Sequence, residues 1–127
     1  MGEYNPFEKD YVYQYNRLLN VIEMERALKY LEGTHDFTSF IKADVEQDDK
    51  IRTIIQTNLS RDPRDMNKIT ISFLGTGFLR YMVRNMVGFL IEVGEGKYKS
   101  EDVLKILESK DRTKAGITAK PEGLYLK

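Results

Sequence analysis

An apolar run at 77–94 constrains the fold more than any other part of this chain. At about 100° per residue, its ten apolar side chains point in nearly every direction around a helix, which is typical of a helix buried on most sides. They are Phe78, Leu79, Met82, Val83, Met86, Val87, Phe89, Leu90, Ile91 and Val93. Such a helix would span roughly 25 Å, close to a membrane thickness, but two arginines and an asparagine near its middle would be very costly in lipid. We therefore predict a core helix of a soluble domain, with no membrane partner.

Arg84 lies in the most apolar window of that run. A buried guanidinium persists only where a carboxylate or carbonyl groups satisfy its donors. The sequence alone leaves the partner open, and an internal acid such as Glu92 or Glu108 is one candidate. Arg84 therefore predicts an acidic partner, either in this chain or in a neighbour.

Three stretches resemble one known family and follow one another in its order. The first is the run 78–88 with its continuation at 92–97, the second is His-Asp-Phe-Thr-Ser-Phe at 35–40, and the third is 110–119 with Gly-Leu-Tyr-Leu at 123–126. Together they resemble the bacterial tRNA pseudouridine synthase A family over nearly the whole chain. The resemblance implies the C-terminal half of that catalytic fold, formed here by residues 1–127 as a single domain.

Length and composition are compatible with this interpretation but do not establish it. A chain of 127 residues suits one domain, and the absence of cysteine excludes disulfides, thiolate metal sites and cysteine nucleophiles. That absence fits a reducing cytoplasm. The net charge is zero, yet residues 1–50 hold 6 Lys/Arg against 11 Asp/Glu, whereas residues 51–127 hold 14 against 9. A basic second half is suitable for binding a phosphate backbone, but the whole chain is less basic than a stand-alone nucleic-acid binder.

Local patterns predict an α+β domain with a mostly antiparallel sheet and helices on one face. Strands are expected near 11–15, close to a sheet edge, at 51–59 and 68–74 as an antiparallel hairpin around a turn at 61–67, and at 123–126. Tyr11, Tyr13 and Tyr15 alternate, which favours a packed strand face over base stacking.

Helices are expected from an Asn20 cap to Gly33 and from a Ser100 cap through 101–109, with Val103, Leu104, Ile106 and Leu107 packed. Residues 35–40 read as a turn. Glycines at 94 and 96 follow the central helix and indicate its end, because the remaining parts of a phosphate-binding loop are missing.

The chain lacks the parts of a complete active site. It has one histidine, no metal-ligand spacing, and no nucleophile elbow that would make His35, Asp36 and Ser39 a catalytic triad. No Gly-Arg-Thr-Asp stretch is present, although the family carries its catalytic aspartate in such a motif. The resemblance therefore implies that the aspartate and an active-site tyrosine belong to a preceding segment, and that the isolated chain is inactive.

The resemblance assigns catalytic roles to two residues of this chain, Arg84 and Leu124. Arg84 would hold the aspartate in a bidentate pair, and Leu124 would form an apolar wall beneath a flipped uracil. The implied reaction detaches uracil from its ribose, rotates it and rejoins it through carbon, without a cofactor, in the anticodon stem-loop of tRNA. The alternative interpretation places Leu124 in the core and Arg84 in an internal ion pair.

Residues around this centre are candidates for tRNA contact. In the family, the loop after Thr-Ser-Phe reaches the tRNA, although here the loop 42–50 carries net negative charge, which would repel phosphate. A second loop, 111–122, has a basic excess. For Arg80 and Tyr81, a solvated surface is an equally good interpretation. The candidates are Lys42, Asp44, Gln47, Asp48, Lys50, Arg80, Tyr81, Arg112 and Lys120.

Three functions are therefore compatible with the sequence. The leading one is the C-terminal domain of a tRNA pseudouridine synthase, with tRNA as substrate and a homodimer as the full-length state, as the resemblance implies. The others are a free-standing RNA-binding module and a structural or dimerising domain.

Overall fold

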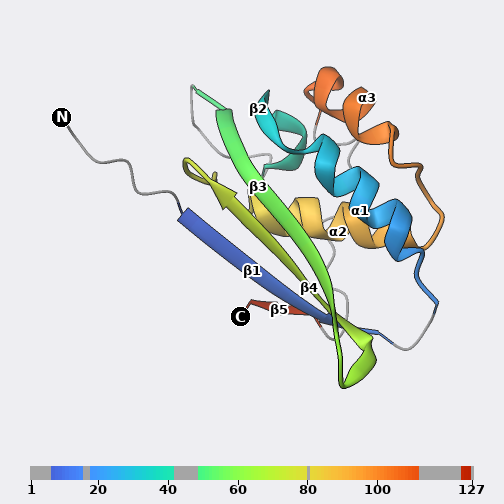
Figure 1. Ribbon diagram of the computed structural model, residues 1–127. Coiled ribbons are helices and arrows are strands. Elements are labelled where there is room, and N and C mark those ends of the chain that lie inside the picture. Colours follow the sequence, from blue (N-terminus) through green and yellow to red (C-terminus); the bar gives the residue numbers. More distant parts are fainter. Residues whose placement is uncertain (1–6, 16–17, 42–48, 80, 112–123, 127) are drawn as a thin grey trace.

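The computed structural model describes residues 7–15, 18–41, 49–79, 81–111 and 124–126, and Figure 1 shows their arrangement. Within these ranges five strands form one sheet in the order β2-β3-β4-β1-β5, and every pair of neighbours is antiparallel. The strands are β1 (Phe7–Gln14), β2 (Gly33–Asp36), β3 (Ile51–Asp62), β4 (Asp65–Gly75) and β5 (Leu124–Leu126).

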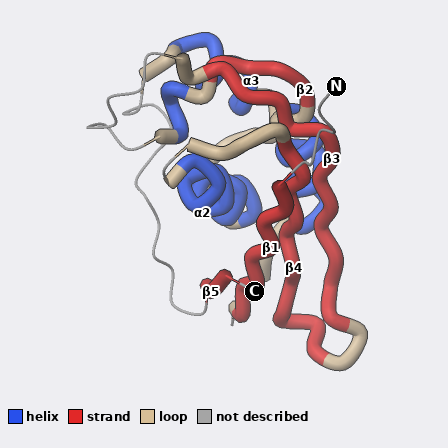
Figure 2. The backbone as a smooth tube through the Cα atoms, turned by 90° about the vertical axis from the view of Figure 1, so that its left-hand side faces the viewer, coloured by secondary structure: helices blue, strands red, loops and turns tan. Residues whose placement is uncertain are grey.

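In the part of the chain that the structure describes, three α-helices and one short 3-10 helix pack on one face of this sheet, which confirms the predicted α+β fold (Figures 1 and 2). They are α1 (Val21–Tyr30), η1 (Thr38–Phe40), α2 (Met82–Gly94) and α3 (Asp102–Ser109). Within the described ranges no helix is long and apolar enough to cross a membrane.

The central helix begins later than the sequence indicates. Tyr81 has a φ of 62°, in the left-handed region, so the helical path starts at Met82 and not at Phe78. Leu79, in the segment that leads into the helix, is still buried. The predicted helix end is confirmed, because α2 stops at Gly94 and Gly96 has a φ of 87°.

The hairpin of β3 and β4 forms as predicted, but its turn is much shorter than residues 61–67. Only Pro63 and Arg64 lie outside the strands, and Asp62 pairs with Asp65. The Asp62 carboxylate accepts a hydrogen bond from the Arg64 backbone N–H at 2.8 Å, which closes the turn locally. Asp62 and Asp65 are typical turn residues, but here they extend the paired strands β3 and β4 because their neighbours pair as well.

Strand alternation produces the expected apolar floor. Ile69, Ile71 and Phe73 of β4 are fully buried. Tyr13 of β1 and Tyr15 just after it are buried and their rings stack at 5.7 Å between centroids, so the prediction of a packed tyrosine face is confirmed. β1 lies one strand in from the edge, between β4 and β5.

Residues 35–40 form regular structure instead of a simple turn. Gly33–Asp36 pairs with β3 as a strand, since it lies directly beside Ile51–Ile54. After Phe37, Thr38–Phe40 form η1, where the Asp36 carboxylate accepts a hydrogen bond from the Thr38 backbone N–H at 3.0 Å. The predicted turn is therefore wrong for the first half of this motif.

The two helix starts that were assigned from sequence have different outcomes. Asn20 caps α1 as predicted, with its side-chain oxygen accepting from the Glu23 N–H at 3.1 Å. Ser100 is not the cap of α3, because its hydroxyl donates to Glu101 and its backbone N–H donates to the Glu23 carboxylate at 2.9 Å. Asp102 accepts from the Lys99 N–H instead, at 2.8 Å.

One position of α3 also departs from the predicted packing. Val103, Ile106 and Leu107 are buried, but Leu104 is 42% exposed. Leu104 lies only about 100° from Val103 around the helix axis, which is enough to leave the face that packs on the core.

A glycine-to-alanine change in β4 tests the close approach between β3 and β4. A Cβ at Gly75 would lie 2.9 Å from the Thr53 carbonyl oxygen and 3.1 Å from the Phe78 ring. Because backbone cannot swing aside, Gly75→Ala is expected to lower the free energy of unfolding by about 1–3 kcal/mol in urea denaturation. Gly77→Ala is the matched control, since the nearest atom there is 3.8 Å away. Equal stability of the two variants would contradict this packing.

The contact between α1 and Ser100 predicts a specific acid dependence. The Ser100 backbone N–H lowers the pKa of the Glu23 carboxyl from its ordinary 4.5, so the charged form is favoured in the folded state. That contribution to stability is present above the unfolded pKa and is lost as pH falls through the folded pKa. Glu23→Gln should therefore be less stable than the parent near pH 7, with the difference shrinking toward pH 3. The neighbouring Glu25→Gln variant is the control, and urea midpoints across that range measure both.

Candidate active site

Arg84 lies in the first turn of α2 and is partly buried. Its positive charge acts on Tyr11 of β1. Burial raises the pKa of the Tyr11 phenol above 10.0, and the Arg84 charge partly offsets that increase. The start of α2 is therefore close enough to β1 for a guanidinium and a phenol to interact.

Strand β5 brings the second predicted site residue to the same part of the sheet. In the register of β1 with β5, Tyr11 lies opposite Leu126 and Tyr13 lies opposite Leu124. Figure 2 views α2 nearly along its axis, with β1 and β5 next to it. Leu124 therefore pairs with Tyr13. Tyr13 lies two residues along β1 from Tyr11, the tyrosine on which the Arg84 charge acts.

Neither internal acid proposed from the sequence pairs with Arg84. Among the residues that the structure describes, none accepts a hydrogen bond from its guanidinium or forms an ion pair with it. Glu92 faces other charges: burial raises its pKa, while Lys97 lowers it and Glu95 raises it further. Glu108 is exposed on α3.

Asn85, next to Arg84 in the candidate site, was not singled out by the sequence patterns. It is buried, and its amide nitrogen donates to the Phe40 carbonyl oxygen at 2.8 Å. This bond joins the start of α2 to η1, so the 35–40 motif fixes the position of the residue beside Arg84. The available signal was a lone amide in an apolar run, since a buried amide needs partners.

Tyr11 was also missed as a neighbour of Arg84. Its alternation with Tyr13 and Tyr15 placed it correctly on the packed face, but no sequence pattern indicates which helix crosses that face at a given residue. Together Tyr11, Arg84 and Asn85 define an end of the core where a charged group is held between buried elements.

Two of the predicted RNA-contacting residues can be placed. Tyr81 is exposed just before α2. Lys50 is partly buried, its carbonyl oxygen accepts from the Phe37 N–H at 3.0 Å, and its charge acts on Asp36. Burial raises the pKa of Asp36, but hydrogen bonds from Thr38 and the charges of Lys110 and Lys50 lower it overall.

The other predicted RNA contacts lie outside the described residues. They are Lys42, Asp44, Gln47, Asp48, Arg80, Arg112 and Lys120. Over the ranges that are described, no three acidic or histidine side chains come together in a way that would hold a metal ion.

Comparison with known sequences identifies the class of protein to which this α+β domain belongs. The family model described as tRNA pseudouridine synthase matches residues 27–127. The chain therefore belongs to the tRNA pseudouridine synthase family.

Individual relatives agree with the family match. A protein named tRNA pseudouridine synthase A from Pseudothermotoga lettingae is 44% identical over 124 residues, covering 98% of this chain and 50% of the relative. Proteins of the same name from Anoxybacillus flavithermus and Streptococcus pneumoniae are each 44% identical, over 99% and 97% of this chain. The chain spans about half the length of the curated relatives it matches.

The interaction of Arg84 with Tyr11 can be measured directly. Because the guanidinium stabilises the phenolate, Arg84→Met should raise the pKa of the Tyr11 phenol further above 10.0. Titration of tyrosine ¹³Cζ resonances follows this group, with circular dichroism to confirm that the fold stays intact. Arg26→Met, on α1 with a largely exposed side chain, is the control and should leave Tyr11 unchanged. An unchanged Tyr11 titration in Arg84→Met would mean that the two groups do not meet.

Proposed function

We propose that this chain forms the C-terminal part of a catalytic domain that isomerises uridine to pseudouridine in the anticodon stem-loop of tRNA. The preceding part of the fold supplies the catalytic aspartate, and the two parts together form the active site. Family membership and the half-length match to relatives named tRNA pseudouridine synthase A support this assignment.

The observation that carries the proposal is the position of Arg84 in α2. A helix N-terminus bears partial positive charge, so a cation in the first turn opposes the helix dipole. The first turn of α2 also contains no acidic residue. Arg84 is therefore a poor choice for helix stability, but a carboxylate placed against it would interact favourably with both the guanidinium and the helix end.

A carboxylate in that position has a defined chemical role. The planar guanidinium offers two parallel N–H donors, so it keeps an aspartate ionised and fixes its orientation toward the uracil ring. Partial burial beside Tyr11 reduces the screening of this pair by water. Arg84 thus positions the aspartate, which forms and breaks bonds to the nucleotide.

Leu124 provides the apolar side of the proposed site. Its backbone pairing with Tyr13 places β5 next to β1, the strand that also carries Tyr11. A uracil taken out of its base stack needs an apolar surface to replace stacking. Leu124 is suited to that task, and no cofactor is required.

The assignment includes further properties of the complete protein. We expect a homodimer that acts on tRNA in the cytoplasm, with tRNA contacts among the basic and loop residues named above. A free-standing RNA-binding or dimerising module is the alternative, and retained tRNA affinity without pseudouridine formation in the experiment below would favour it.

A chimera tests the proposed function. This chain replaces the matching half of the Pseudothermotoga lettingae relative, and pseudouridine formation is measured as tritium release from a tRNA labelled in uracil. The chimera should form pseudouridine, and the chain alone should form none. Arg84→Lys in the chimera keeps the charge but removes the planar fork, so turnover should fall by about a hundredfold or more.

The same substitution in the isolated chain separates catalysis from stability. A residue that serves the active site contributes little to the fold, whereas breaking a buried pair within the core costs about 3–5 kcal/mol. The melting temperature of Arg84→Lys should therefore match that of the parent. A collapsed melting temperature would make Arg84 a structural residue, and an unchanged turnover would remove it from the site.

A further inference from the structure

The outer edge of β3 is only partly covered. Strand β2 pairs with β3 no further than Ile54, which lies opposite Gly33. Residues 56–61 of β3 are in regular register with β4, so their backbone groups alternate between the two edges of the strand. The Thr57 N–H and C=O groups both bond to side chains from the α1 region, which shows that they point away from β4. Leu59 and Arg61 share that direction.

Among the described residues, side chains from the α1 region cover the outward backbone groups of Thr57 but not those of Leu59 and Arg61. The Glu32 carboxylate accepts from the Thr57 N–H at 2.8 Å, and the Lys29 ammonium donates to the Thr57 carbonyl oxygen at 2.7 Å. These contacts block strand addition at Thr57. No described residue gives Leu59 or Arg61 an equivalent bond at the same edge.

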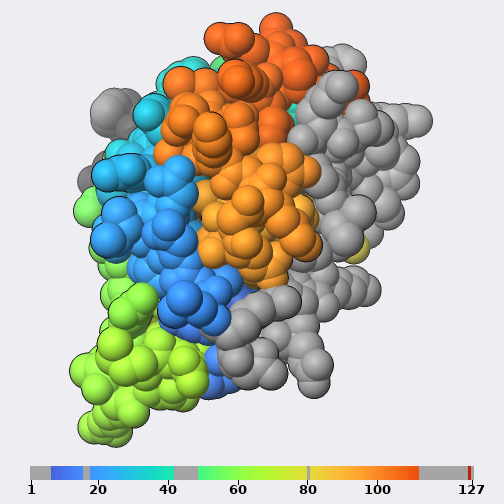
Figure 3. All heavy atoms as spheres, turned by 90° about the vertical axis from the view of Figure 1, so that its right-hand side faces the viewer, coloured from blue at the N-terminus to red at the C-terminus, as the bar shows by residue number. Residues whose placement is uncertain are grey.

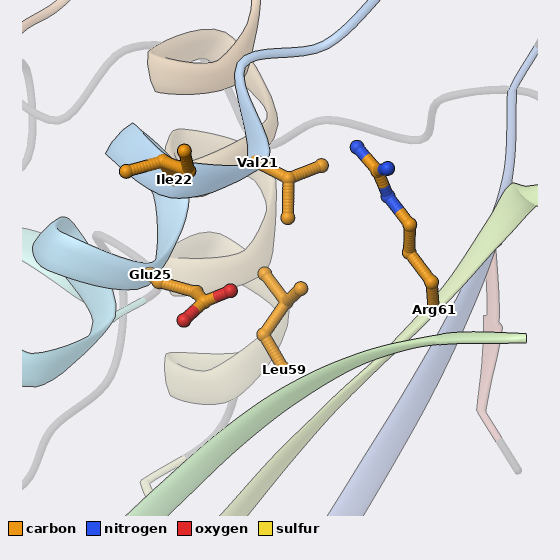
Figure 4. Close-up of a pocket in the computed structure, with 5 residues that line it drawn as sticks. All are labelled: Val21, Ile22, Glu25, Leu59 and Arg61. Carbon is orange, nitrogen blue, oxygen red and sulfur yellow. The ribbon is translucent and has the colours of Figure 1, made fainter.

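A cleft lies beside these two free positions. Its volume is about 290 Å³, and it is lined by Val21, Ile22 and Glu25 of α1 and by Leu59 and Arg61 of β3 (Figure 4). Ile22 is 67% exposed, which is unusual for a large aliphatic side chain on a helix that otherwise packs. Figure 3 shows this surface, where α1 lies directly above the hairpin of β3 and β4.

The charges at this cleft are ordered along the strand. Arg61 lies toward the hairpin turn, Leu59 and Val21 form the middle, and Glu25 lies one helical turn further along α1 (Figure 4). A strand that pairs antiparallel with β3 would therefore meet a cation first, an apolar surface second and an anion third. Side chains two residues apart face the same side of a strand, so a partner that pairs with Arg61 and Leu59 directs its third side chain toward Glu25 as its backbone leaves the edge at the capped Thr57.

We propose that this cleft binds a short extended peptide segment of a partner protein, which adds a strand to the edge of β3. The segment carries an acidic residue, then an aliphatic residue two positions on, then a basic residue two positions further. Main-chain hydrogen bonds to Leu59 and Arg61 supply the pairing, and the aliphatic side chain enters the cleft. This site lies at the β3 edge, two strands from β1 and its Tyr11, and does not depend on the proposed catalytic role.

A short peptide fits this edge better than a second copy of the chain. Within the described part of the chain, only Leu59 and Arg61 have free outward groups on this stretch of β3, because Thr57 is capped and the regular register ends at Arg61. A stable pair of globular copies commonly buries about 1,200–2,000 Å². Two residues of edge beside a five-residue cleft fit a transient peptide contact.

Titration of the ¹⁵N-labelled chain with a designed peptide tests the proposal. The probe is acetyl-Thr-Asp-Thr-Ile-Thr-Lys-Thr-amide, and its isoleucine aligns with Leu59. We expect saturable shifts of the Leu59 and Arg61 amide resonances with a Kd of roughly 0.1–1 mM. The same peptide with an N-methyl group on isoleucine cannot form the central bond and should bind at least tenfold more weakly.

Variants locate the site. Ile22→Lys and Arg61→Glu should each weaken binding about tenfold, whereas Leu104→Lys on α3, where the leucine is exposed far from the cleft, should not. No saturable shift at 2 mM peptide, or equal binding of the N-methylated peptide, would overturn the proposal. If sedimentation shows the parent chain to be dimeric and Ile22→Lys monomeric, a second copy occupies the edge and the peptide proposal is wrong.

Discussion

The burial of α2 is the constraint on which the rest of the domain depends. Of its thirteen residues only Arg84 and Glu92 keep partial exposure, so the helix needs cover in almost every direction. β4 provides an apolar floor, α1 crosses the helix near Gly94, and η1 closes the other end through Asn85. A single sheet face cannot bury such a helix alone, which is why the flanking helices lie on the same side.

The two charged residues of α2 mark two different ends of this core. Glu92 lies near the C-terminal end, where burial raises its pKa and Lys97 offsets part of that cost. Arg84 lies near the N-terminal end, beside a phenol and among described residues that offer it no carboxylate. Lys97 thus offsets part of the burial of Glu92, whereas no described residue supplies a carboxylate to Arg84.

Sequence patterns predicted the elements whose signal is local. The alternation in β4, the Asn20 cap and the glycine stop after α2 depend on neighbours within a few residues, and all three are confirmed. The failures depend on distant partners. Ser100 gives its N–H to Glu23, 77 residues away, and the strand at Gly33–Asp36 exists because β3 lies beside it.

The same distinction explains the candidate site. Arg84 and Leu124 were assigned through family motifs, and the register of β1 with β5 brings their strands and helix to one end of the core. Tyr11 was missed because its relation to Arg84 depends on how α2 crosses the sheet, which no periodicity encodes. A helix start that carries a cation and lacks an acid is also a local signal for an external anion, since the helix dipole disfavours it otherwise. The position of Arg84 at the start of α2 is therefore the feature of this chain that a proposal of chemistry divided between two parts of a protein has to explain.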